Sequence, residues 1–148
     1  MIGTYWPHLV AIGVGVGLTA QVGMNMALGR AMHSPLAATV VNFAVGLAAL
    51  IACAIAVGVR WNTTEALQAP AWSWAGGLLG ATYVVSVTTL GPRLGALALF
   101  TLVLAGQLGA ALIVDRYGVL GFPRAEITPL RLVGAGLVVA GVLLVLRR

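Results

Sequence analysis

The sequence contains no lysine and only three acidic residues in 148 positions. Charged side chains make up 7% of the chain, whereas soluble domains carry about 25%. Hydrophobic residues make up 61%, so a soluble fold would have too little polar surface to face water. The single cysteine, Cys53, excludes a disulfide within the chain. These deficits exclude the soluble globular class and predict one transmembrane domain over residues 1–148.

The patterns that mark enzymes are also missing. The sequence has no carboxylate pair, no nucleophile–base spacing, no phosphate loop and no cluster of metal ligands. His8 and His33 are isolated and are expected on opposite sides of the membrane, so they cannot form a metal pair within one protomer. The net charge of +5 comes from scattered arginines without a basic stripe, which excludes nucleic acid as a partner. We therefore expect a protein that is not an enzyme and needs no cofactor.

Five long apolar runs remain. A helix needs roughly 20 apolar residues to cross the hydrocarbon core. The runs are continuous rather than alternating, which favours helices over the strands of a barrel. The sequence therefore predicts an all-α integral membrane bundle of five transmembrane helices, with the lipid bilayer as its surroundings. The expected helices cover about residues 9–28, 36–59, 72–90, 94–114 and 128–146.

Capping residues support these boundaries. Ser34 followed by Pro35 is typical of the N-cap and first position of a helix, here the second. Asn62 with Glu65 resembles a capping box, which predicts a short interfacial helix over residues 63–68.

Two further patterns concern how the helices meet. Gly91-Pro92 predicts a minimal turn that makes the third and fourth helices antiparallel. Pairs of small residues four positions apart indicate faces where backbones approach closely in lipid. The pairs are Gly13 with Gly17, Gly76 with Gly80, and Ala105 with Gly109.

The eight arginines set the expected orientation. An excess of basic residues in cytoplasmic loops normally fixes which way a membrane protein faces. With the N-terminus outside, four arginines lie on each side of the membrane. The sequence therefore has no charge bias that favours one orientation. We therefore predict dual topology and an antiparallel homodimer, in which an odd helix number creates an inverted pair of copies. The inner set is Arg30, Arg93, Arg147 and Arg148, and the outer set is Arg60, Arg116, Arg124 and Arg131.

Polar side chains within the apolar runs are the candidate site, because burying them in lipid is costly. Gln21 and Asn25 are four apart and share a helix face. One interpretation is a hydrogen-bonding cavity that binds a small polar solute, and the other is that these groups only join helices. The candidate binding residues are Gln21, Asn25, Asn42, Tyr83, Ser86 and Gln107.

Asp115 is the acidic residue nearest to a membrane span. It is a candidate site for proton or cation coupling. The alternative is an ion pair at the membrane surface or a loop cap.

The ordered set of motifs resembles the YdcZ-type, five-helix branch of the drug/metabolite transporter (DMT) superfamily over nearly the whole chain. The resemblance implies a multi-pass protein of the bacterial inner membrane, forming one half of a DMT-like inverted-repeat architecture around a central site. The residues that carry it are Gln21, Asn25, Leu28, Ser34-Pro35, Phe43, Gly46, Trp74, Gly76-Gly77, Gly80-Ala81, Pro92, Gly95, Gly106-Gln107, Asp115, Gly118, Pro123, Arg131 and Gly134.

The working hypothesis is transport of a small polar metabolite by alternating access as an antiparallel dimer. One alternative is a proton-coupled exporter like the small multidrug resistance branch, whose coupling glutamate in the first helix has no counterpart here. Another is a non-transporting assembly subunit, or one half of a heterodimer. The substrate, the direction of movement and the coupling ion are left open.

Overall fold

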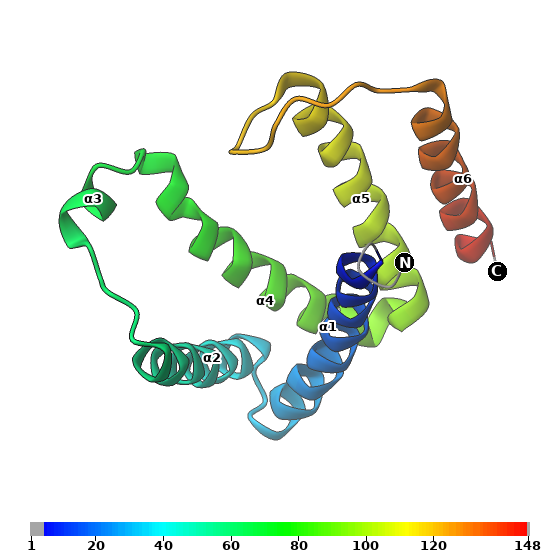
Figure 1. Cartoon of the computed structure of the whole chain (residues 1–148). Helices are drawn as coiled ribbons and strands as arrows, with labels where there is room; N and C mark the ends of the chain where they lie inside the picture. Colours follow the sequence, from blue (N-terminus) through cyan, green and yellow to red (C-terminus); the bar gives the residue numbers. More distant parts are fainter. Residues whose placement is uncertain (1–4, 148) are drawn as a thin grey trace. The chain divides into compact units, whose positions relative to one another are not determined.

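The computed structural model describes residues 5–147, and every regular element in that range is helical (Figure 1). The prediction of an all-α membrane protein is confirmed. Long apolar helices dominate because a continuous apolar run satisfies its backbone hydrogen bonds only within itself when it enters lipid. The elements are α1 Trp6–Ala31, α2 Pro35–Val57, α3 Thr63–Leu67, the 3-10 helix η2 Ala71–Ala75, α4 Gly76–Leu94, α5 Ala96–Tyr117 and α6 Pro129–Leu146.

The chain divides into two compact units, and the boundary lies between Arg93 and Leu94. In the first unit α1 contacts α2, and in the second unit α5 contacts α6. Each unit is described by itself below. The expectation of a single transmembrane domain stays a prediction.

Four helices within the described residues are long and apolar enough to cross a membrane: α1, α2, α5 and α6. The third expected span corresponds to α4, which is not among them. Its 19 residues give a length of roughly 28 Å, close to the thickness of the hydrocarbon core. Glycine, hydroxyl side chains and Arg93 lower its hydropathy, however. The count of five spans therefore stays a prediction.

A tight hairpin joins α1 to α2. The N–H of Ser34 donates to the carbonyl of Gly29 at 3.0 Å, and the N–H of His33 donates to the carbonyl of Arg30 at 3.3 Å. These two bonds form a Schellman motif, in which His33 occupies the left-handed position usually taken by glycine (φ 52°). The Ser34 hydroxyl then accepts from the N–H of Ala37 at 3.1 Å, and Pro35 opens α2. The predicted capping pair is confirmed.

The short helix predicted after Asn62 is also present and ends one residue before the predicted boundary, while its place at the membrane interface stays a prediction. The Asn62 side chain accepts a hydrogen bond from the N–H of Glu65 at 3.3 Å, and α3 follows it over five residues. The cap works because the first N–H groups of a helix have no partner within the helix.

The minimal turn expected at Gly91-Pro92 is wrong. Both residues lie inside α4, which continues to Leu94. A proline so close to the helix end removes one backbone hydrogen bond without breaking the last turn. The chain instead breaks at Gly95, whose φ of 75° and ψ of 160° are open to glycine but not to other residues.

Candidate functional site

The predicted amides of α1 and α2 meet along the seam between these helices. Nε2 of Gln21 donates to Oδ1 of Asn42 at 3.5 Å, the long limit for such a bond. Eight residues further along α1, the backbones approach closely at Gly29. A Cβ built there would lie 3.5 Å from Cα of Pro35 and 3.7 Å from Cβ of Ala38. These are ordinary van der Waals distances, so the two helices are in direct contact at Gly29.

Asn25 lies between these two contacts on the same face of α1, four residues from Gln21 and four from Gly29. Its side chain is 3% exposed, and its Nδ2 has no hydrogen-bond partner among the described residues. A buried donor without a partner costs about 1–3 kcal/mol. The seam therefore holds a polar group that an acceptor from outside the described chain would satisfy.

A cavity of about 430 Å³ adjoins the seam. Its polar end is formed by Gln21 and Asn42, and the rest of its wall is apolar. Ligand pockets for small organic molecules commonly combine an apolar wall with a few polar groups in this way. The other lining residues are Phe43, Val45, Gly46, Leu47 and Leu50.

Two of the predicted binding residues lie on α4. Tyr83 is partly buried and Ser86 is exposed. The α4 helix approaches α2 at Gly80, where an added Cβ would lie 3.8 Å from Cζ of Phe43. No hydrogen bond within the described residues joins Tyr83 or Ser86 to the amides of the seam. Their role in binding stays a prediction.

Thr88, also on α4, is a candidate that the sequence analysis missed. It is 2% exposed, and its Oγ1 has no partner within residues 5–147. By contrast, Thr39 and Thr82 each donate to the carbonyl four residues earlier at 2.9 Å. The sequence signal that could have pointed to Thr88 is Pro92, four residues later. Proline has no N–H, so it cannot donate the usual helical hydrogen bond to the Thr88 carbonyl. A buried, unpartnered hydroxyl thus sits beside a carbonyl that has lost its usual helical partner.

Gln107 belongs to the second unit. It lies on α5 and its side chain is exposed. Its place in the cavity of the first unit stays a prediction.

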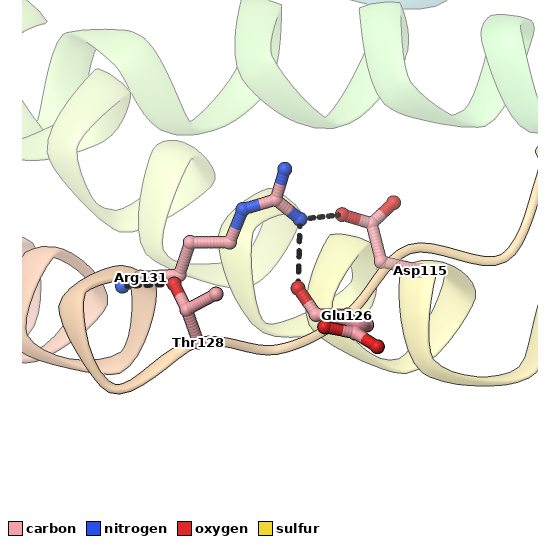
Figure 2. A network of polar contacts seen from close by, with 4 residues as sticks. All are labelled: Asp115, Glu126, Thr128 and Arg131. Carbon is pink, nitrogen blue, oxygen red and sulfur yellow. Dashed lines mark hydrogen bonds and ion pairs between the residues drawn. The ribbon is translucent and has the colours of Figure 1, made fainter.

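Asp115 also belongs to the second unit, near the C-terminal end of α5. Its Oδ2 lies 3.4 Å from Nη1 of Arg131, and the two side chains are 37% and 52% exposed. Figure 2 shows the Arg131 guanidinium between Asp115 and the backbone oxygen of Glu126, which accepts a second bond at 3.3 Å. The pair borders a cavity of about 340 Å³ whose walls come from α5 and α6. An ion pair at a helix end is therefore present, while a role in coupling stays a prediction.

No group of three His, Cys, Asp or Glu side chains comes together within the described residues to hold a metal ion. The polar groups at hand are amides, hydroxyls and one ion pair. They are suited to binding and releasing a solute by hydrogen bonds.

Comparison with known families gives a match over most of the chain. The family model DMT_YdcZ, described as "Putative inner membrane exporter, YdcZ", matches residues 6–144. That range covers α1 through most of α6, including every candidate residue described above. No curated protein and no solved structure matches the chain.

Proposed function

The chain belongs to the YdcZ family of inner-membrane proteins, and from this premise we propose that it transports a small polar metabolite by alternating access as an antiparallel homodimer. The inner membrane is its location, and membrane transport is the activity that the family description indicates. That description also favours export as the direction of movement. The identity of the solute is addressed by experiment below.

The observation that carries the proposal is the unpartnered Nδ2 of Asn25 in the α1–α2 seam. Side chains that only join helices find partners across the interface, because lipid offers none. Asn25 is buried and lacks such a partner in the described chain. A solute with a carbonyl, carboxylate or hydroxyl oxygen would supply the missing acceptor.

The neighbouring amides fit the same role. The bond between Gln21 and Asn42 is long, and it leaves one acceptor of Gln21 and the amide donors of Asn42 available to the cavity. A weak bond of this kind exchanges easily for bonds to a solute. Solute binding would therefore change the contact between α1 and α2. In this way the occupancy of the cavity would be coupled to the relative position of the two helices.

The dimer is supported by helix faces that have no neighbour within their own compact unit. A Cβ added at Gly13, Gly17 or Gly109 would meet nothing within 4 Å. Faces of small residues usually contact another helix in membranes. Together with the even division of arginines, they support an inverted second copy as the partner.

Transport is tested with purified protein in proteoliposomes. A thermal-shift screen of polar metabolites first identifies ligands, because a ligand that binds only the folded state raises its stability. Flux of the best ligand is then measured for the parent and for Gln21→Leu and Asn25→Leu. Both variants should lose most of the flux, whereas Thr82→Val, which alters an exposed hydroxyl bonded to its own helix, should keep it. Parental flux in both leucine variants would contradict the assigned binding residues.

Topology is tested with reporters for the periplasm and the cytosol fused to the C-terminus. A homodimer of inverted copies predicts signal from both reporters. Signal from one compartment, with no related chain present, would contradict the antiparallel arrangement. A requirement for a second chain in purified complexes would instead favour a heterodimer.

A proton-coupled exporter is a second candidate, and the Asp115–Arg131 pair is the observation that favours it. The Asp115 carboxylate lies beside the cavity between α5 and α6 and forms an ion pair with Arg131. A carboxylate that releases its arginine on protonation can link proton binding to movement of these two helices. Flux that is insensitive to a pH gradient would exclude this candidate.

A further inference from the structure

The connection between α5 and α6 is an ordered loop that folds back onto the end of α5. The N–H of Ala125 donates to the carbonyl of Asp115 at 2.8 Å, and Nη1 of Arg131 donates to the carbonyl of Glu126 at 3.3 Å. Both bonds tie the returning part of the loop to a helix. Figure 2 shows the second of these ties together with the Asp115 carboxylate.

A glycine makes this return possible. Gly118 ends α5 with a φ of 63°, and a Cβ there would lie 3.0 Å from both N and Cβ of Arg124. The close approach fixes the backbone of Arg124 against the end of α5. The backbone of Arg116, in the last turn of α5, is therefore held at a defined position relative to the backbone of Arg124.

The folded loop borders an open cavity of about 600 Å³, lined by Arg116, Arg124, Ala125, Glu126 and Ile127. Both arginines are exposed, and the one ion pair within the described residues joins Arg131 to Asp115 instead. Arg116 and Arg124 thus have no carboxylate within ion-pair distance among those residues. Even with Glu126 counted, the cavity carries a net positive charge.

The loop also presents apolar side chains close to this charge. Tyr117 is 71% exposed, and Val119, Leu120 and Phe122 are exposed as well. The cavity lies at the ends of α5 and α6, both of which are apolar enough to span the membrane. Arginines beside exposed aromatic and aliphatic residues at the end of a span are typical of the headgroup region of a bilayer.

We propose that Arg116 and Arg124 form a binding site for the phosphate of an anionic phospholipid headgroup. The planar guanidinium group binds phosphate oxygens through two parallel hydrogen bonds, and two such groups lining one cavity add specificity. The apolar loop residues contact the upper acyl chains while the cavity receives the headgroup. The site belongs to the second unit, whereas the cavity proposed for transport belongs to the first.

The test uses the full-length protein in detergent, with phosphatidylglycerol, phosphatidylcholine or inorganic phosphate added separately. Native mass spectrometry counts retained lipid, and thermal unfolding measures stabilisation. Phosphatidylglycerol should be retained and should raise the melting temperature more than phosphatidylcholine does. The double variant R116Q/R124Q should lose about thirtyfold in phosphatidylglycerol affinity, from the loss of two basic groups at an acidic lipid surface.

The matched control is R60Q/R93Q, which removes two exposed arginines from other segment ends. It should retain phosphatidylglycerol as the parent does. The variant R116K/R124K keeps the charge but loses the paired hydrogen-bond geometry, and intermediate affinity is expected. This lysine variant also provides the measurement if the glutamine variant does not fold.

Three outcomes would overturn the proposal. Unchanged phosphatidylglycerol binding in R116Q/R124Q, or in the lysine variant if it is the one measured, would show that these arginines are not the site. An equal loss in R60Q/R93Q would show that net charge alone attracts the lipid. Stabilisation by inorganic phosphate that matches phosphatidylglycerol would point to a soluble anion as the ligand.

Discussion

Gln21 of α1 reaches across to Asn42 of α2, donating from Nε2 to Oδ1 at 3.5 Å. The two residues are 21 positions apart in the chain, and a tight hairpin brings them together. Their contact marks one end of the α1–α2 seam, and Gly29 marks the other. The buried Asn25 lies between Gln21 and Gly29 on α1. Whether its amide finds a hydrogen-bond partner therefore depends on how α1 and α2 pack along this seam.

Replacing Asn25 with leucine should separate stability from activity. Leucine has a similar volume and no donor to leave unsatisfied, so the free energy of unfolding should rise by about 1–3 kcal/mol. Transport should be lost, because the proposed donor to the solute is gone. Thermal unfolding in detergent and flux in proteoliposomes measure the two effects.

Thr39→Val is the matched control for this prediction. Thr39 is also buried, but its hydroxyl donates to the Pro35 carbonyl at 2.9 Å. The variant should keep transport, with stability lowered by about 1 kcal/mol. A destabilised Asn25→Leu protein would mean that the amide is satisfied in the folded state and only joins helices.

His33 should be a site of stored backbone strain. Its φ of 52° is unfavourable for a side chain, while the Schellman motif at the end of α1 requires this conformation. His33→Gly should stabilise the protein by about 1 kcal/mol. Met32→Gly is the control, since Met32 has an ordinary φ of −90° and glycine there should not stabilise. Equal melting temperatures for parent and His33→Gly would argue against strain at this position.

Gly118 should tolerate no side chain. Gly118→Ala faces both a left-handed φ and a contact of 3.0 Å with the backbone of Arg124, and should cost more than about 2 kcal/mol. Gly121→Ala measures the cost of the left-handed φ alone, because Gly121 has a φ of 85° and open space around it. The melting temperature of Gly118→Ala should therefore be lower than that of Gly121→Ala. The reverse order would contradict the packed loop. Weaker phosphatidylglycerol binding in Gly118→Ala would follow from the same change.

The Asp115–Arg131 pair should contribute little to stability and more to function if transport is proton-coupled. Both side chains are partly exposed, so Asp115→Asn should change the free energy of unfolding by less than about 1 kcal/mol. Accumulation driven by a pH gradient should disappear, while exchange of solute without a gradient should remain. Glu126→Gln is the control, because Arg131 contacts the backbone oxygen of Glu126 rather than its carboxylate. Unaltered gradient-driven accumulation in Asp115→Asn would remove Asp115 as the coupling residue.

Local features were the most predictable part of the fold. The Ser34 and Asn62 caps depend on residues three positions apart, and both occur as expected. The break after α4 was placed at Gly91-Pro92 because this pair usually interrupts helices. The structure has it at Gly95, since a proline near a helix end removes only one bond, whereas a φ of 75° demands glycine.

The candidate site was predictable only in part. The sequence placed Gln21 and Asn25 on one helix face, which follows from helical periodicity. It did not reveal that Asn42 bonds to Gln21, nor that Thr88 is buried without a partner. Those properties depend on which faces of separate helices meet, and helices in lipid meet through packing detail that apolar sequence patterns barely encode.

The sequence by itself determined the class of the protein and its place in the membrane, because uninterrupted apolar runs leave the backbone no alternative to helices in lipid. It also determined the family, through motifs that run from Gln21 to Gly134, and the family model matches residues 6–144. Only the tertiary structure decided which polar groups are satisfied, namely the Asp115–Arg131 pair, and which are not, namely Asn25 and Thr88. The reason is that hydrogen bonding requires atoms of distant segments to come within about 3 Å, and the convergence of helices at positions such as Gly29 sets that distance.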